Sequence, residues 1–241
     1  RQSAIKSLVL LLQKLIDDGK QFCIAGIKGG NAVNAIPREA EVIIGFPESH
    51  ADSAIMMMEK IFISMKGDFS GTDPDARLSV SEQSVPHLAL SSGDSRHLIS
   101  TLASLPNGPL AREPALQDTT RTSANLGILV LEEKNGVLEL EVQTLIRSSV
   151  EEEMEATADE LESKLASLGA KSLRPVRAPA WKPEPENHLL SLAVEEFKKL
   201  FGKAPRVTSL HAGLECGVFR EKYPSLEIVS FGATIRNPHS P

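Results

Sequence analysis

The residues best suited to chemistry lie in two short segments near the end of the sequence. The first, residues 208–217, carries His211, Glu215 and Cys216 where a predicted strand runs into a glycine-bearing turn and a helix start. In layered α/β proteins, a turn at the carboxyl end of a strand lines the ligand crevice. The same pattern is also compatible with a plain strand-to-helix connection, so both interpretations stay open.

The second segment, residues 231–241, places His239 after a predicted strand and between Pro238 and Pro241. Because prolines restrict the backbone, such a loop is a good place for a ligand-binding histidine. A single histidine is nevertheless more often a surface or hydrogen-bonded residue. The six histidines form no His-x-x-x-His pair, and Cys-x-x-Cys does not occur. Local motifs therefore do not assemble a complete metal site.

Taken together, the two segments closely resemble the carboxyl-terminal part of a known enzyme family. "HAGLECGVF" and "YPSLEIVSFGATIRNPHSP" are similar to the aminoacyl-histidine dipeptidases, also called cytosol non-specific or Xaa-His dipeptidases, which are co-catalytic zinc metallopeptidases. Four upstream segments resemble the same family in the same order, and these are "GGNAVNAIPREAEV", "RTSANLGIL", "LIRSS" and "PAWKPEPENHLL". The resemblance covers nearly the whole chain.

The resemblance implies an α/β protein with two parts. Residues 1–173 look like an α+β lid domain, a sheet packed with helices, whose start is missing. Residues 174–241 look like the C-terminal portion of a layered α/β catalytic domain. In this family the lid forms a homodimer and the catalytic domain binds two zinc ions per subunit. The other metal ligands and the general base are expected upstream, so we expect the chain alone to be an inactive fragment with no catalytic residue of its own.

The same resemblance assigns roles to five residues. His239 matches a zinc ligand, and a neutral imidazole suits that metal. Arg147 matches the lid arginine that holds the substrate carboxylate, to which a guanidinium can bind with two prongs. Asn125 matches a lid residue that polarises the scissile carbonyl or holds the peptide. Gly213 and Glu215 match the turn that lines the substrate pocket. The implied reaction is hydrolysis of dipeptides by zinc-activated water.

Composition excludes other classes of partner. Lys and Arg number 26 against 32 Asp and Glu, the net charge is −6, and aromatic residues make up 4% of the 241 residues. A nucleic-acid-binding protein usually has the opposite charge. The longest aliphatic run, residues 8–12, is far too short to span a membrane. Two cysteines are too few for a disulfide framework, so we expect a cytoplasmic protein.

Hydrophobic periodicity and turn residues predict the elements that must position these side chains. Residues 106–121 read as a loop and 174–187 as a proline-rich linker. The predicted helices are 3–16, 51–65, 93–105, 149–168, 189–201 and 214–222. The predicted strands are 22–27, 40–46, 76–82, 126–134, 137–146, 205–210 and 226–232. A capping box, Ser149 to Glu152, is predicted to start the fourth helix.

Asn135-Gly136 predicts a type I′ hairpin turn, and this turn sets a strand register. In an unbroken ladder Asn125 lies opposite Ile146 and Arg147 lies opposite Ala124, so their side chains point to opposite faces. If both reach one site, a bulge or strand end near Ala124 must break the register.

Two other functions remain open at this stage. A deacylase or carboxypeptidase of the same superfamily is one, although "GLECG" and "NAIPRE" favour the dipeptidases. A dimerisation or ligand-binding module without catalysis is the other. An enzyme of this type requires stoichiometric metal and a module does not.

Overall fold

The fold was obtained as a computed structural model that describes residues 2–69, 71–113, 119–174, 179, 181–182, 184, 186–208 and 215–232. The chain divides into two compact units. Unit 1 comprises residues 1–110, 123–146 and 156–173, and unit 2 comprises 111–122, 147–155 and 174–241. Within the described ranges, no helix is long and apolar enough to cross a membrane.

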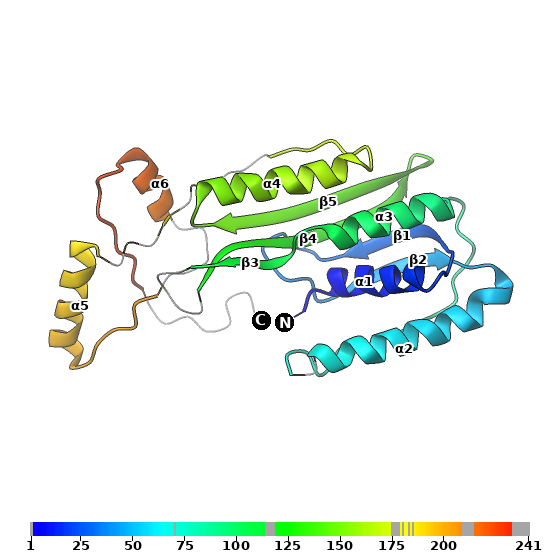
Figure 1. The fold of residues 1–241 in the computed structure, drawn as a ribbon, viewed down its shortest axis with the longest axis horizontal. Helices are drawn as coiled ribbons and strands as arrows, with labels where there is room; N and C mark the ends of the chain where they lie inside the picture. Colours follow the sequence, from blue (N-terminus) through cyan, green and yellow to red (C-terminus); the bar gives the residue numbers. More distant parts are fainter. Residues whose placement is uncertain are drawn as a thin grey trace. The chain divides into compact units, whose positions relative to one another are not determined.

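A five-stranded sheet forms the centre of unit 1 (Figure 1). Its strands follow the order β2-β1-β4-β3, and β5 also pairs with β4. β1 pairs antiparallel with both β2 and β4. The strand bounds are Cys23–Gly29 for β1, Ala40–Gly45 for β2, Gly108–Arg112 for β3, Thr120–Lys134 for β4 and Val137–Ser148 for β5. The predicted α+β architecture, a sheet packed with helices, is confirmed.

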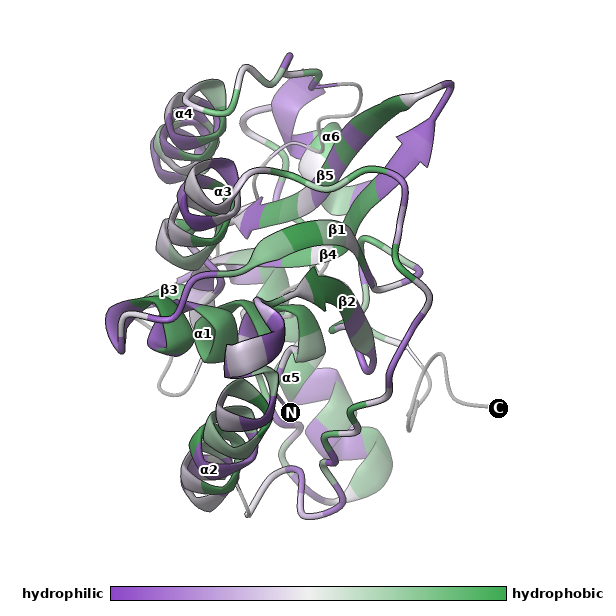
Figure 2. Cartoon of the chain, turned by 90° about the vertical axis from the view of Figure 1, so that its right-hand side faces the viewer, coloured by the Kyte–Doolittle hydropathy of each residue, from purple (hydrophilic) through white to green (hydrophobic). Residues whose placement is uncertain are grey.

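Helices α1 to α4 lie on one face of this sheet in both views of the chain (Figures 1 and 2). α1 begins after Ser3, whose hydroxyl accepts the Lys6 N–H at 3.4 Å, and α3 begins after Ser91, which accepts the Asp94 N–H at 3.1 Å. Serine at this position satisfies a helix N–H that has no partner within the helix. The bounds are Ala4–Asp17 for α1, Ala51–Phe69 for α2, Ser92–Ser104 for α3 and Glu151–Ala166 for α4.

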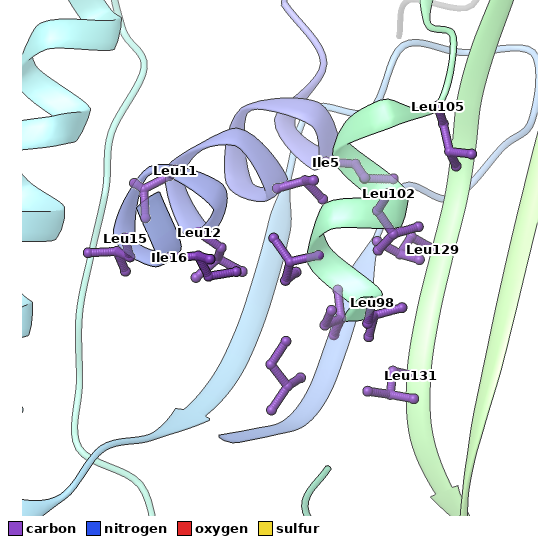
Figure 3. Packing of buried hydrophobic residues seen from close by; sticks show 14 of the residues in the cluster. Ile5, Leu11, Leu12, Leu15, Ile16, Leu98, Leu102, Leu105, Leu129 and Leu131 are labelled. Atoms are coloured by element: carbon purple, nitrogen blue, oxygen red, sulfur yellow. The ribbon is translucent and has the colours of Figure 1, made fainter. Parts of the chain in front are cut away.

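The core of unit 1 fills the space between these helices and the sheet (Figure 3). Leu12, Leu15, Leu102 and Leu129 are each 0% exposed. Figure 2 shows hydrophobic residues along β1, and Ile24 and Ile27 of this strand belong to the core. Burial of side chains this large is the main favourable term in folding, at about 1.5–3 kcal/mol each.

A lysine from α1 closes the end of α3. Lys6 Nζ donates to the carbonyls of Leu102, Ala103 and Leu105 at 3.3, 2.5 and 3.0 Å. Lys164 Nζ of α4 donates to the neighbouring Ser104 carbonyl at 2.6 Å. Burial, and secondly the charge of Lys164, lower the pKa of Lys6. Cations suit the negative end of a helix, so two lysines join three helices here.

The β4–β5 hairpin has the predicted turn but a different register. Asn135 and Gly136 have φ values of 53° and 81°, as a type I′ turn requires. Farther along, Ser149 N donates to the Arg121 carbonyl at 3.1 Å. Arg121 lies thirteen residues before Lys134, but Ser149 lies only twelve after Val137. β4 therefore contains one extra residue, a bulge.

The burial pattern locates the bulge. Side chains at Thr122, Ala124 and Leu126 are buried, and then the buried positions move to Leu129 and Leu131. The alternation changes phase between Leu126 and Leu129, nearer the turn than Ala124. The assumption of an unbroken ladder, under which Asn125 and Arg147 point to opposite faces, is therefore wrong.

Two predictions about the connecting segments are wrong. Residues 76–82 form no strand: Ala76 and Leu78 pack against the core without a neighbouring ladder. Within the predicted loop 106–121, β3 forms and β4 begins at Thr120, because β4 offers an edge with which β3 can pair.

The predicted capping box is also wrong. α4 begins at Glu151, and the Ser149 hydroxyl donates to Glu113 Oε2 at 3.3 Å. Ser148 Oγ accepts the Val150 N–H at 3.0 Å, so the helix entry is held one residue earlier.

Unit 2 contains α5, His188–Phe201, and α6, Glu215–Lys222, both close to their predicted bounds. The Asn187 side chain accepts the Leu190 N–H at 3.1 Å, and both oxygens of Glu227 accept N–H groups of the first turn of α5 at 3.1 Å. Contrary to prediction, residues 205–208 and 226–232 form no strand, and the last two residues of the predicted strand 205–210 lie outside the described residues. A strand requires a paired backbone, and no described strand pairs with either segment.

Candidate substrate site

Asn125 binds the loop that follows β1. Its Nδ2 donates to the Val33 carbonyl at 2.7 Å and to the Ala35 carbonyl at 2.9 Å. A carboxamide nitrogen has two hydrogens, so these two bonds use its donor capacity. The predicted role of Asn125 as a donor to a developing oxyanion would require one of these bonds to break. In this structure the side chain instead fixes residues 33–35.

Two glycines allow the same loop to approach β4. A Cβ at Gly127 would lie 2.5 Å from Val33 Cα, and one at Gly30 would lie 1.9 Å from the Gly127 carbonyl oxygen. Gly30 also has a φ of +71°, which strongly favours glycine. The next strand residue, Leu126, donates its N–H to Asn107 Oδ1 at 2.9 Å. The loop after β1, Asn125 and the bulged part of β4 therefore pack together.

Arg147 is the penultimate residue of β5 and is half-buried. The chain immediately after it is fixed by Ser148. The Ser148 and Thr122 hydroxyls are 2.8 Å apart, and Thr122 is only 2% exposed. Together with the Ser149–Arg121 backbone bond, these contacts leave the entry to α4 little freedom.

Glu153 of α4 completes this network. Arg121 binds its carboxylate with Nη2 at 2.5 Å and with Nε at 3.1 Å, and the Thr122 hydroxyl donates to the same carboxylate. The bond from Thr122, and with it Arg121, lowers the pKa of Glu153 against the opposing effect of burial. No local sequence motif predicts this network, because Glu153 lies 32 residues from Arg121 and 31 from Thr122. The sequence feature that indicates the network is the Arg121-Thr122 pair on β4, which lies opposite the acidic "RSSVEEE" segment at the end of β5.

Glu215 is the first residue of α6 and is exposed. Gly217 anchors this helix, since a Cβ there would lie 2.6 Å from the Pro179 carbonyl oxygen. Arg220 pairs with Glu184 and donates to the Leu226 carbonyl at 2.5 Å. An open pocket of about 380 Å³ lies in this unit, lined by Ser149, Val150, Glu151, Glu152, Pro179, Lys182, Glu184, Arg220 and Glu221.

Gly213 and His239 lie outside the described residues. Among the residues that are described, no group of three or more His, Cys, Asp or Glu side chains is arranged to hold a metal ion. The described part of the chain therefore does not by itself fit a zinc pair.

Residues 1–70 match the family described as "Peptidase dimerisation domain" (M20_dimer). The chain is also 30% identical over 213 residues to a protein named "Cytosol non-specific dipeptidase" from Escherichia coli (strain K12). The aligned residues cover 88% of this chain and 43% of that protein. The structure of this chain is similar to that of aminoacylhistidine dipeptidase from Vibrio alginolyticus, with a TM-score of 0.85 and 27% identity. The match covers 96% of this chain and 47% of the Vibrio chain.

The chain is similar to the aminoacyl-histidine dipeptidases over most of its length. It spans about half the length of the two dipeptidases that it matches. Both similarities run through most of the chain, so the dipeptidase resemblance is not confined to the dimerisation segment. The candidate site residues on β4, β5 and α6 lie among local contacts that the sequence motifs did not reveal.

Proposed function

We propose that the complete protein containing this chain is a cytoplasmic dipeptidase that hydrolyses the peptide bond of Xaa-His and other dipeptides. The observation that carries this proposal is the similarity of 88% and 96% of the chain to two proteins that are both named dipeptidases. The arrangement around Arg147 supports it, because a rigid strand end that carries a guanidinium suits capture of a substrate carboxylate.

The proposed site residues have different roles. Arg147 binds the substrate carboxylate, and Glu215 and Gly213 line the substrate pocket. Asn125 belongs to the site as the residue that fixes the loop at Val33–Ala35. His239 contributes one ligand to a zinc pair whose other ligands lie elsewhere in the complete protein. A metal of this kind supplies a water that is acidic enough to attack an amide.

We further propose that the protein is a homodimer formed through residues 1–173. The family description of residues 1–70 supports this. β2 is an edge strand, and the exposed side chains of Met56 and Ile63 on α2 are 70% and 71% accessible. An open sheet edge and exposed apolar side chains each favour association with another chain.

The proposed activity is tested with the complete protein and a panel of dipeptides, tripeptides and N-acyl amino acids. Turnover confined to dipeptides supports the proposal. Turnover of N-acyl amino acids alone indicates a deacylase, and binding of dipeptides without turnover or bound metal indicates a module without catalysis. His239→Ala is expected to lower both metal content and activity. Two zinc ions per subunit with normal turnover would remove His239 from the site.

A further inference from the structure

We propose that Glu153 is a positioning residue for Arg147, acting through the Thr122–Ser148 contact rather than by touching substrate. This inference rests on the proposed role of Arg147 in binding the substrate carboxylate. It concerns a residue on α4 that no sequence motif assigned to the site.

The first step is the carboxylate itself. Glu153 receives two bonds from one guanidinium, that of Arg121, and a third from the hydroxyl of Thr122. A two-pronged Arg–carboxylate pair has a defined geometry, unlike a single charged contact. Glu153 thus holds two adjacent β4 residues against the first turns of α4.

The second step carries this constraint across to β5. The Thr122 hydroxyl, held by Glu153, lies 2.8 Å from the Ser148 hydroxyl, and Ser148 Oγ also accepts the Val150 N–H at 3.0 Å. Ser149 N is bonded to the Arg121 carbonyl at 3.1 Å. All three residues after Arg147 are therefore tied to Arg121, Thr122 or each other. A strand end held in this way restricts the directions in which the preceding arginine can extend.

The third step concerns the negative charge of the Glu153 carboxylate. The bond from Thr122 and the contact with Arg121 lower the pKa of Glu153, so the carboxylate remains ionised at neutral pH. A glutamine at this position keeps the shape but loses the ion pair with Arg121, and its NH2 group cannot accept the second of the two Arg121 bonds. Glu153→Gln should therefore loosen the network without removing it.

The test compares two substrates in the complete protein. A dipeptide with a free carboxylate needs a correctly placed Arg147, and the same dipeptide as its C-terminal amide does not. We expect Glu153→Gln to raise KM for the free dipeptide by about tenfold, equivalent to about 1.4 kcal/mol, with kcat nearly unchanged. KM for the amide, or its inhibition constant if it is not cleaved, should stay unchanged. A merely structural role would alter both substrates alike.

The matched control is Glu195→Gln, which removes the same charge from an exposed position on α5, away from the pocket. It should leave both constants unchanged. Thr122→Val, which keeps the shape of the side chain but removes the hydroxyl, provides a second variant if Glu153→Gln does not fold. Its effect should have the same sign and the same dependence on the free carboxylate.

Arg147→Lys is measured alongside to separate the two proposals. If Arg147→Lys reduces the preference for the free dipeptide but Glu153→Gln and Thr122→Val do not, the positioning role is overturned and the role of Arg147 stands. If Arg147→Lys also leaves the preference unchanged, the proposed role of Arg147 fails, and the inference about Glu153 fails with it.

Discussion

The side-chain amide of Asn125 on β4 donates a hydrogen bond to the backbone carbonyl of Val33 at 2.7 Å, joining residues that are 92 positions apart. A second bond from the same nitrogen reaches Ala35 at 2.9 Å. Because both partners are carbonyl oxygens, only a donor can occupy this position. The loop after β1 is thus held by one side chain from another strand.

Replacement of Asn125 by aspartate tests this arrangement. Aspartate has the same shape but presents oxygens to two carbonyl oxygens, so Asn125→Asp should destabilise the chain at least as much as Asn125→Ala. We expect a loss of about 1–3 kcal/mol in the free energy of unfolding, measured by urea denaturation. Hydrogen exchange at residues 31–36 should become faster in both variants. An aspartate variant as stable as the wild type would contradict the assignment.

Gly127→Ala should destabilise the chain because the new Cβ would lie 2.5 Å from Val33 Cα. Backbone atoms cannot move away as a flexible side chain can, and overpacking of this kind costs about 1–3 kcal/mol. Gly45→Ala is the matched control, since a Cβ there meets nothing within 4 Å. Thermal unfolding of the two variants compares them directly, and equal melting temperatures would show that the loop does not pack as described.

Acid should selectively weaken the network at Glu153. Its pKa is lowered in the folded state, so the unfolded chain binds the proton more readily, and stability rises with pH in the window between the two values. The contribution is complete above the ordinary glutamate pKa of about 4.3 and is lost as pH falls through the lowered value. The difference in unfolding free energy between wild type and Glu153→Gln should therefore shrink as the pH is lowered from 6 to 3. A difference that grows over this range would contradict the sign.

Dimerisation of the 26.0 kDa chain can be measured by sedimentation at micromolar concentration. We expect the mass of a dimer, and we expect the double substitution of Met56 and Ile63 by glutamate to shift it toward that of a monomer, because charges at an apolar interface lose hydration without gaining a partner. Leu200→Glu, at an exposed apolar position outside residues 1–173, serves as the control and should not change the mass. A wild-type monomer would count against the proposed interface.

Local sequence was sufficient for the elements whose signals are local. The apolar periodicity of α1 and the Asn135-Gly136 turn each depend on residues within a few turns of the chain, and the structure confirms both. The family motifs likewise identified the dipeptidase family, because each motif is a short run of specific residue types.

Tertiary structure alone decided the features that depend on distant backbone. Residues 76–82 and 226–232 have strand-like composition, but a strand exists only where another backbone pairs with it. The close approach of Val33 to Gly127 on β4 likewise depends on the folded chain, and sequence spacing does not reveal it. For the same reason the partners of Asn125 and Glu153 could not be read from the sequence, since each hydrogen bond joins residues that only the folded chain brings within 3 Å.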